Sequence, residues 1–171
     1  FVRYSLKLAY RTVKLLFLHR SSQMMNLLYL GFPDTQVLEA LMSDLPYEYY
    51  IDIVTKRYFH AVDNYDLEGV LDCFHSDASL SEVTTMTRHA GRDQGIKTMF
   101  EGLFDSFSHI WHGNFVHTTD AESQSICSQF TVLITPHDSE ELRYENCNRF
   151  YLRDGKFSEV FVYMSGDNLL R

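Results

Sequence analysis

The sequence predicts an α+β domain in which three helices precede a meander of antiparallel strands. Between residues 47 and 107, apolar side chains recur at the spacing of a buried helix face. Beyond residue 110 the apolar period changes to two, which is the spacing of strands with one buried face. A chain of 171 residues with 45% hydrophobic content can bury the core of one ordinary domain.

The first helix is expected over residues 47–63, where the apolar residues share one face. A second, shorter helix is expected over residues 67–74. Asp66 stands just before this second helix. A carboxylate at that position can accept the unpaired amide hydrogens of the first turn, so we predict that Asp66 is its N-cap.

The first strand is expected over residues 78–84, and the stretch 85–92 is interpreted as a polar connection. The third helix is expected over residues 93–107, with Asp93 as its N-cap. Short runs of turn-forming residues then separate four long segments of period two. We expect these segments to form strands over residues 110–118, 125–135, 142–152 and 157–164.

Charge is distributed unevenly along the chain. Residues 1–41 carry five basic and two acidic residues, a net charge of +3, whereas the whole chain carries −8, which leaves −11 for the remainder. An acidic body lacks the clustered Lys and Arg of a nucleic-acid groove, so no nucleic-acid partner is expected. Residues 1–41 are expected to be an upstream extension without a functional role, and residues 42–171 to form the domain.

The apolar residues near the start of the chain are interrupted by basic ones, and no apolar run approaches the roughly 18 residues of a membrane helix. No small-residue cleavage site follows a clean apolar core, so neither a secretory signal nor a membrane partner is expected. The three cysteines, Cys73, Cys127 and Cys147, lack metal-ligand spacing and are interpreted as reduced, packed thiols. Together these features predict a cytoplasmic protein.

A series of short motifs follows a fixed order along the chain. The motifs are Arg57-Tyr58, Asp66-Leu67, Gly69, Phe74, Asp77-Ala78, the acid at Glu82, Gly91-Arg92-Asp93, Ile96 and Asp154-Gly155-Lys156. No single motif is specific, but their order persists over roughly three quarters of the chain, which is an ordinary domain length. The ordered series resembles the nuclear-transport-factor-2-like superfamily, which includes ketosteroid isomerases and SnoaL-like polyketide cyclases.

The resemblance implies a curved sheet wrapped around the helices to make a cone with an apolar cavity. It implies cofactor-free isomerisation, cyclisation or dehydration of a small apolar carbonyl compound by proton transfer. It also implies a homodimer formed through the exposed face of the sheet. The tail over residues 166–171 is expected to cover either the mouth of the cavity or a partner subunit.

Glu82 is the candidate general base. Strand alternation places it on the same face as Leu80, so an inward Leu80 implies an inward Glu82. An apolar cavity would raise the pKa of its carboxyl towards the range useful for proton transfer. By the resemblance, Glu82 stands where ketosteroid isomerases hold a catalytic aspartate. The alternative is a surface glutamate at a strand end.

Tyr58 and Asn148 are the candidate oxyanion donors implied by the resemblance. A buried phenol can donate to a developing enolate, although Tyr58 can equally be a packing aromatic on its helix. Asn148 falls where the isomerases hold a protonated aspartate, and an amide donates without any pKa shift. Alternation places Asn148 inward with Phe150, whereas a slip of one residue would place Cys147 there instead.

His117 is an auxiliary candidate. It shares the parity of Phe115, whereas His112 has the opposite parity. By the resemblance to dehydratase and cyclase members, His117 could orient a water or polarise a carbonyl. The alternative is a histidine with a satisfied hydrogen bond at a sheet surface. The eight histidines form no metal-binding motif, so no metal is expected.

A second function class stays open, because this fold hosts many functions. The domain could be a non-catalytic ligand-binding or assembly module whose aromatic sheet face is an interface. Glu82 on the outside, or large side chains filling the cavity, would favour this module. An empty apolar pocket in which Glu82 and Tyr58 converge would favour the enzyme.

Overall fold

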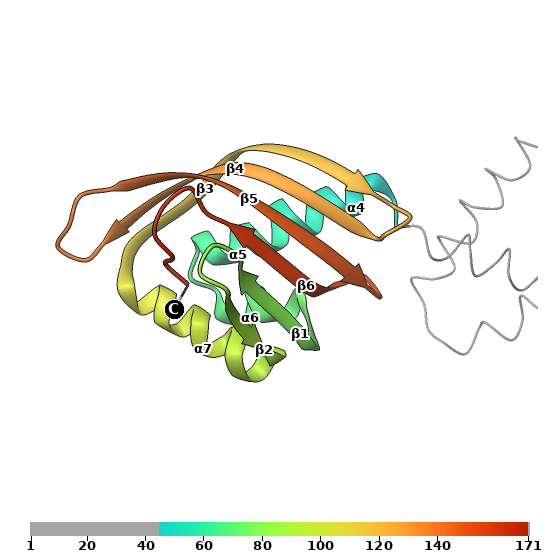
Figure 1. Ribbon diagram of the computed structural model, residues 1–171, viewed down its shortest axis with the longest axis horizontal. Coiled ribbons are helices and arrows are strands. Elements are labelled where there is room, and N and C mark those ends of the chain that lie inside the picture. Colours follow the sequence, from blue (N-terminus) through green and yellow to red (C-terminus); the bar gives the residue numbers. More distant parts are fainter. Residues whose placement is uncertain (1–44, 171) are drawn as a thin grey trace, which may run out of the picture. The chain divides into compact units, whose positions relative to one another are not determined.

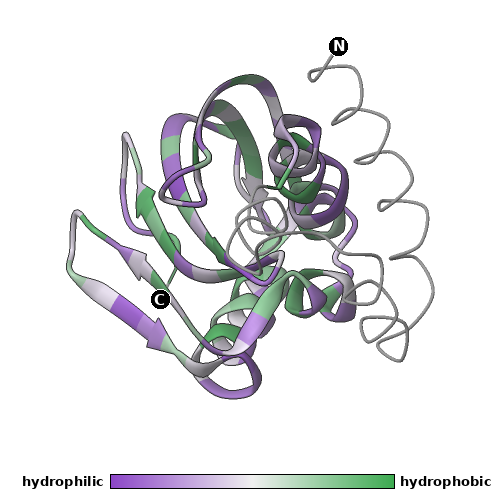
Figure 2. Ribbon diagram, turned by 90° about the vertical axis from the view of Figure 1, so that its right-hand side faces the viewer, coloured by the Kyte–Doolittle hydropathy of each residue, from purple (hydrophilic) through white to green (hydrophobic). Residues whose placement is uncertain are grey.

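The computed structural model describes residues 45–170, and the expected extension over residues 1–41 lies outside the described residues. The described part is mixed α+β, with helices packed on the inner side of an open, curved, six-stranded sheet (Figure 1). The expected fold class is therefore confirmed. The strands alternate between hydrophilic and hydrophobic residues along their length, so one face of the sheet is apolar (Figure 2).

The first helix is continuous from α4 (Tyr47–Asp52) through η2 (Ile53–Phe59) to α5 (His60–Asp63), which confirms the predicted span. The middle turns, in η2, have π-helical geometry. Apolar residues of the predicted face are buried, because this face lies against the concave side of the sheet. Val54, Tyr58, Ala61 and Val62 of the predicted face are buried, Ile51 is partly buried, and Ile53 and Phe59 are buried beside them.

The second helix, α6 (Leu67–Asp72), begins where the sequence predicts. Asp66 is its N-cap: the backbone N–H of Gly69 donates to Asp66 Oδ1 over 3.0 Å. A Cβ at position 69 would lie 2.3 Å from Asp66 Oδ2, so the cap and the glycine fit one another. This short helix thus begins with one of its otherwise unpaired amides satisfied.

Replacing Asp66 with Ala should lower the free energy of unfolding by about 1 kcal/mol, since the amide of Gly69 would lose its partner. Urea unfolding of the full chain measures the change. Asp72→Ala is the matched control, because Asp72 is exposed in the last turn of the same helix, where a carboxylate faces the negative end of the helix dipole. An equal loss of stability in both variants would contradict the capping role.

The first strand, β1 (Phe74–Glu82), begins earlier than predicted. It pairs in parallel with the last strand, although the register shifts between Phe74 and Ser79. A second short strand, β2 (Thr87–Ala90), pairs antiparallel with β1. The prediction of a polar connection over residues 85–92 is therefore wrong. No large apolar residue occurs in β2, so it carries no periodic signal.

The third helix comprises η3 (Gly91–Ile96) and α7 (Lys97–Ser106). It begins two residues before the predicted start, and the prediction of Asp93 as its N-cap is wrong. Asp93 lies inside the first turn and forms an exposed ion pair with Arg92, with Nε and Oδ1 2.7 Å apart. Gly91 has φ of 79°, a conformation that glycine adopts without strain, and it lets the chain turn from strand into helix.

The four predicted long strands are confirmed with small changes at their ends. They are β3 (Phe107–Asp120), β4 (Ser125–Pro136), β5 (Leu142–Arg153) and β6 (Lys156–Tyr163). The strand order across the sheet is β2-β1-β6-β5-β4-β3, and every neighbouring pair except β1 with β6 is antiparallel. The long strands therefore form the expected meander, and β1 and β2 extend the sheet at one edge.

Aromatic rings fill most of the space between the helices and the concave face. The ring of Tyr58 lies at their centre, with five phenylalanine ring centroids 4.8–6.1 Å away, all at steep edge-to-face angles. Edge-to-face pairs add to the stabilisation from buried area alone. The five neighbours come from a helix before the sheet, a helix after β2 and three strands: Phe59, Phe74, Phe100, Phe150 and Phe157.

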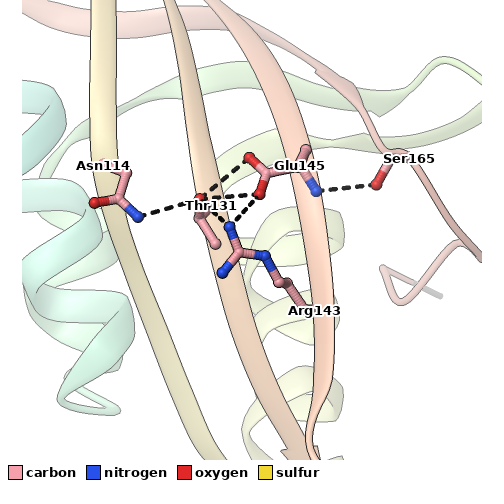
Figure 3. Close-up of polar contacts among 5 residues, drawn as sticks. All are labelled: Asn114, Thr131, Arg143, Glu145 and Ser165. Atoms are coloured by element: carbon pink, nitrogen blue, oxygen red, sulfur yellow. Dashed lines mark hydrogen bonds and ion pairs between the residues drawn. The ribbon is translucent and has the colours of Figure 1, made fainter.

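The face of the sheet opposite the helices carries a polar network centred on Thr131 (Figure 3). Its hydroxyl lies 3.1 Å from both carboxylate oxygens of Glu145 and accepts a long hydrogen bond from Asn114. Arg143 pairs with Glu145 over 2.7 Å, and the Ser165 hydroxyl accepts from the Glu145 backbone N–H. This network links three strands to the start of the C-terminal tail.

Candidate functional site

A cavity of about 50 Å³ lies between the helices and the concave face of the sheet. At roughly 10–15 Å³ for each water, it has room for a few water molecules. Most of its wall is apolar, and five polar side chains interrupt it: Tyr58 on the first helix, His112 on β3, and Tyr144, Asn146 and Asn148 on β5. A second hollow over α6 and α7 is open to solvent and bordered by exposed carboxylates. It therefore lacks the combination of an apolar wall with a few polar side chains.

Tyr58 lines the cavity, as the sequence predicts. The side chain is almost fully buried, and burial raises the pKa of its hydroxyl far above the ordinary value of 10, with a smaller contribution from the Cys73 thiol. The phenol is therefore protonated near neutral pH. No residue within 45–170 forms a hydrogen bond with its hydroxyl, so the O–H is available to a molecule in the cavity.

Asn148 also lines the cavity, and its side chain is 3% exposed. Its Oδ1 is buried without a hydrogen-bond partner among the described residues. Cys147 lies on the opposite face, where its Sγ is 3.3 Å from Cys127 Sγ. The register therefore brings Asn148 inward, as predicted, and the alternative with Cys147 is excluded. A buried unpaired amide costs about 1–3 kcal/mol, a cost that a ligand could remove.

Glu82 is fully buried, but its carboxylate does not line the cavity. It holds the turn after β1 instead, accepting hydrogen bonds from Thr84 N (2.9 Å), Thr85 N (2.8 Å) and Thr85 Oγ1 (2.6 Å). Burial alone would raise the pKa of Glu82, yet the hydrogen bonds from the two threonines outweigh it and lower the pKa below its ordinary 4.5. The predicted rise in pKa is therefore wrong.

This lowered pKa has a consequence for stability. A group whose pKa is lower in the folded state stabilises the fold above its unfolded pKa, and the contribution disappears as the pH falls through the folded value. Glu82→Gln should therefore cost about 1–3 kcal/mol near neutral pH, because the turn loses charge-assisted hydrogen bonds. The difference from the wild type should shrink below about pH 4.

Urea unfolding at a series of pH values from about 7 to about 3 measures this difference. Glu122→Gln is the matched control, since Glu122 is exposed on the turn between β3 and β4 and its change should stay within about 0.5 kcal/mol. A cost at Glu82 that is the same at every pH would mean that its charge does not hold the turn.

His117 lies on the concave side of β3, but it does not line the cavity. Its Nδ1 is 2.9 Å from the Ser128 hydroxyl, and its ring stacks on Phe115 with an interplanar angle of 10°. Burial lowers the pKa of this histidine below 6.5. The half-buried ring thus has a satisfied hydrogen bond, which is the alternative that the sequence left open.

His112 lines the cavity instead, and the sequence analysis missed it. Its Nδ1 lies 2.5 Å from Asp63 Oδ1, and its backbone N–H donates to Asp63 Oδ2 over 3.1 Å. Since a carboxylate only accepts, Nδ1 carries the hydrogen and Nε2 has a free lone pair. The ring also packs on Phe59, with centroids 4.4 Å apart. Asp63, at the end of the first helix, thereby fixes both the orientation and the tautomer of His112.

A β-bulge explains why His112 and not His117 reaches the cavity. The pairing of β3 with β4 shifts between Gly113 and Val116, where Asn114 has φ of 56°. An extra residue reverses the alternation of a strand. His112 before the bulge and His117 after it therefore face the same side despite opposite parity. In the sequence, the pair Gly113-Asn114 is the signal for this bulge, because both residue types tolerate positive φ.

Within residues 45–170, no three His, Cys, Asp or Glu side chains gather in a way that could hold a metal ion. No helix in that range is long and apolar enough to cross a membrane. The polar groups around the cavity are therefore two tyrosines, a histidine held by a carboxylate and two side-chain amides. Such a set can donate and accept hydrogen bonds and can move a proton.

Comparison with solved structures finds the same fold in several proteins of low sequence identity. A provisionally named polyketide cyclase from Xanthomonas campestris is 18% identical with a TM-score of 0.60, covering 71% of this chain and 92% of its own. An LEH-like epoxide hydrolase from M. tuberculosis is 15% identical with a TM-score of 0.59, covering 69% and 84%. A protein with a ketosteroid isomerase-like fold from Catenulispora acidiphila is 10% identical with a TM-score of 0.59, covering 66% and 84%.

No curated protein sequence matches the chain. A family model, described as a SnoaL-like domain, matches residues 55–160. That span includes the end of the first helix, the cavity-lining strands β3, β4 and β5, and most of β6. It also contains Tyr58, His112 and Asn148. The chain therefore belongs to the SnoaL-like domain family.

Proposed function

We propose that this chain is a cofactor-free enzyme that binds a small carbonyl compound in the cavity and moves a proton next to the carbonyl. The observation that carries the proposal is the His112–Asp63 pair at the wall of a largely apolar cavity that also contains Tyr58 and Asn148. A polyketide cyclase and an epoxide hydrolase among the structural neighbours add support for a catalyst of small organic molecules.

In this proposal, His112 Nε2 removes a proton from the carbon next to the carbonyl. The C–H bond breaks, an N–H bond forms, and the electron pair moves to the carbonyl oxygen to give an enolate. Asp63 stabilises the imidazolium that results, because its carboxylate is hydrogen-bonded to Nδ1. Tyr58 and Asn148 donate to the enolate oxygen. Return of that proton from Nε2 to another carbon completes an isomerisation. In a dehydration, the C–O bond of a hydroxyl on the next carbon breaks, a carbon–carbon double bond forms, and the hydroxyl takes the proton from Nε2 and leaves as water.

This assignment moves the role of general base from Glu82 to His112. The carboxylate of Glu82 is occupied by three hydrogen bonds from the turn after β1, and its lowered pKa makes it a weak base near neutral pH. Nε2 of His112 has no such partner among the described residues and belongs to a ring at the cavity wall. His117 is an auxiliary group at most, since it hydrogen-bonds to Ser128.

A non-catalytic module is the second candidate, and a specific observation favours it. Large side chains leave a cavity of only about 50 Å³, far below the roughly 300–1,000 Å³ of pockets for drug-sized ligands. The opposite face of the sheet exposes Trp111, Val116 and Tyr163, which suit a contact with a second copy of the chain. A homodimer through this face is compatible with either function.

The distinguishing experiment measures deuterium uptake at the carbons next to the carbonyl of cyclohexanone in heavy water, by proton NMR. The full chain should accelerate this uptake well beyond an equal concentration of free imidazole at the same pH, since the cavity adds oriented hydrogen-bond donors. Uptake equal to that of imidazole, together with binding of cyclohexanone, would refute the enzyme and leave the binding module.

A further inference from the structure

The C-terminal tail forms part of the cavity wall. After β6 the chain leaves the sheet (Figure 1), and Met164, Leu169 and Leu170 return their side chains to the cavity. Leu170 is 9% exposed, so this end of the tail is packed and not loose. The expectation that the tail covers the cavity is confirmed. These three side chains therefore limit the space that the cavity offers to a ligand.

Asn168 fastens the tail to the turn between β1 and β2. Its Nδ2 lies 2.8 Å from Thr85 Oγ1 and 3.2 Å from Thr87 Oγ1, and its Oδ1 accepts from the backbone N–H of Leu170 over 2.8 Å. The side chain of Asn168 is 7% exposed. A further bond joins His89 Nε2 on β2 to the Leu170 carbonyl oxygen over 3.0 Å. The end of the tail is thus held by side chains from the turn after β1 and from β2, whereas its start at Ser165 is hydrogen-bonded to β5.

Glu82 sets the direction of the hydrogen bonds in this turn. A carboxylate only accepts hydrogen bonds, so the Thr85 hydroxyl donates its one hydrogen to Glu82 Oε2, 2.6 Å away. The Thr85 oxygen can then only accept, and the Thr87 hydroxyl, 2.9 Å from it, must donate to it. Both threonine oxygens consequently present lone pairs to the Asn168 amide. The buried charge of Glu82 therefore orients the two acceptors on which the tail depends.

We propose that the tail over residues 164–170 is a lid latched through Glu82, Thr85 and Asn168, and that this latch sets the size of ligand that the cavity admits. Glu82 and Asn168 are positioning residues: neither touches the ligand, and each acts through the placement of Leu169 and Leu170. The proposal rests on the proposed function only in taking the cavity as a ligand site. It assigns a role to Glu82, whose carboxylate is fully buried and which the proposed chemistry leaves unused.

The latch is tested first without any ligand, by amide hydrogen exchange of the full chain. Asn168→Ala and Glu82→Gln should each speed exchange at Leu170 by about tenfold or more, because the closed tail loses its fastening. Asp120→Ala is the control, since it removes a side chain that caps the turn between β3 and β4, remote from the tail in the sequence. Thr87→Val removes the longer Asn168 bond and the bond to the Thr85 hydroxyl, and keeps the 2.8 Å bond from Asn168 to Thr85. Its exchange rate at Leu170 should therefore be intermediate, and it replaces either of the other variants if that variant fails to fold.

Ligand size is then tested with phenol and 1-naphthol as probes, by calorimetry. The wild type should favour phenol, and Asn168→Ala should shift the ratio of the two affinities towards 1-naphthol by about fivefold or more, since an open lid enlarges the cavity. Unchanged exchange at Leu170 with an unchanged affinity ratio would overturn the latch. Because exchange is measured without ligand, it stands apart from the proposed function, which fails separately if the wild type does not deuterate cyclohexanone.

Discussion

Replacing His112 with Asn should slow the deuteration of cyclohexanone by about 10²–10⁴-fold, the range supplied by a positioned general base. An asparagine keeps a donor for the Asp63 carboxylate, so the fold and the cavity wall should survive. It has no basic nitrogen, so the proton next to the carbonyl would have no acceptor. The rate is measured by NMR at a fixed pH near neutrality, with the affinity for cyclohexanone measured alongside.

His109→Asn is the matched control, because His109 is an exposed histidine on the same strand. Its rate should stay within about twofold of the wild type. The deuteration rate of Asp63→Asn should fall between the rates of His112→Asn and His109→Asn. The His112 ring keeps a hydrogen-bond partner in this variant but loses the charge that stabilises the imidazolium. A His112→Asn variant that deuterates cyclohexanone at the wild-type rate would refute this base, and Glu82→Gln would then test the acid predicted from the sequence.

Replacing Phe150 with Ala should lower the free energy of unfolding by about 3–5 kcal/mol, the usual cost of truncating a buried phenylalanine. Phe150 is fully buried, and its ring contacts Tyr58, Phe59 and Phe157 at centroid distances of 4.8–6.2 Å. These rings hold Tyr58 at the cavity wall. Urea unfolding measures the loss, and slower deuteration should accompany it even where the variant is fully folded.

Tyr163→Ala is the control for this prediction. Tyr163 is 47% exposed on the neighbouring strand, so its removal should cost less than about 1 kcal/mol. If the two variants lost similar stability, the aromatic cluster around Tyr58 would not be the main core of the domain. If Phe150→Ala lost stability alone, with deuteration unchanged in the folded protein, the cluster would stabilise the fold without positioning Tyr58.

The strands of the sheet could be predicted from the sequence wherever one face of a strand is buried and the other is exposed to solvent. Asn148 shows how far this reaches: alternation with Phe150 places it in the cavity, and the structure agrees. The same logic failed for β2, in which no large apolar residue records a buried face. It also failed for His112, because a bulge at Gly113 and Asn114 reverses the alternation within β3.

Glu82 shows a different limit. Its burial followed from its parity with Leu80, but its chemistry did not. Whether a buried carboxylate is a base or an anchor depends on the donors around it, and here the donors are two backbone amides and a hydroxyl within the next three residues. Such local hydrogen bonds produce no periodic pattern of apolar residues in the sequence. The partnership of His112 with Asp63 is equally hidden, since the two residues are 49 positions apart.

The central claim is that a small carbonyl compound binds in the cavity between Tyr58, His112 and Asn148. The most direct measurement is the NMR spectrum of the nitrogen-15-labelled full chain during titration with cyclohexanone. We expect the side-chain amide of Asn148 and the ring nitrogens of His112 to shift together at one dissociation constant, with the indole of Trp111 on the opposite face unchanged. Shifts confined to Trp111 and its neighbours, with Asn148 and His112 unmoved, would contradict the claim.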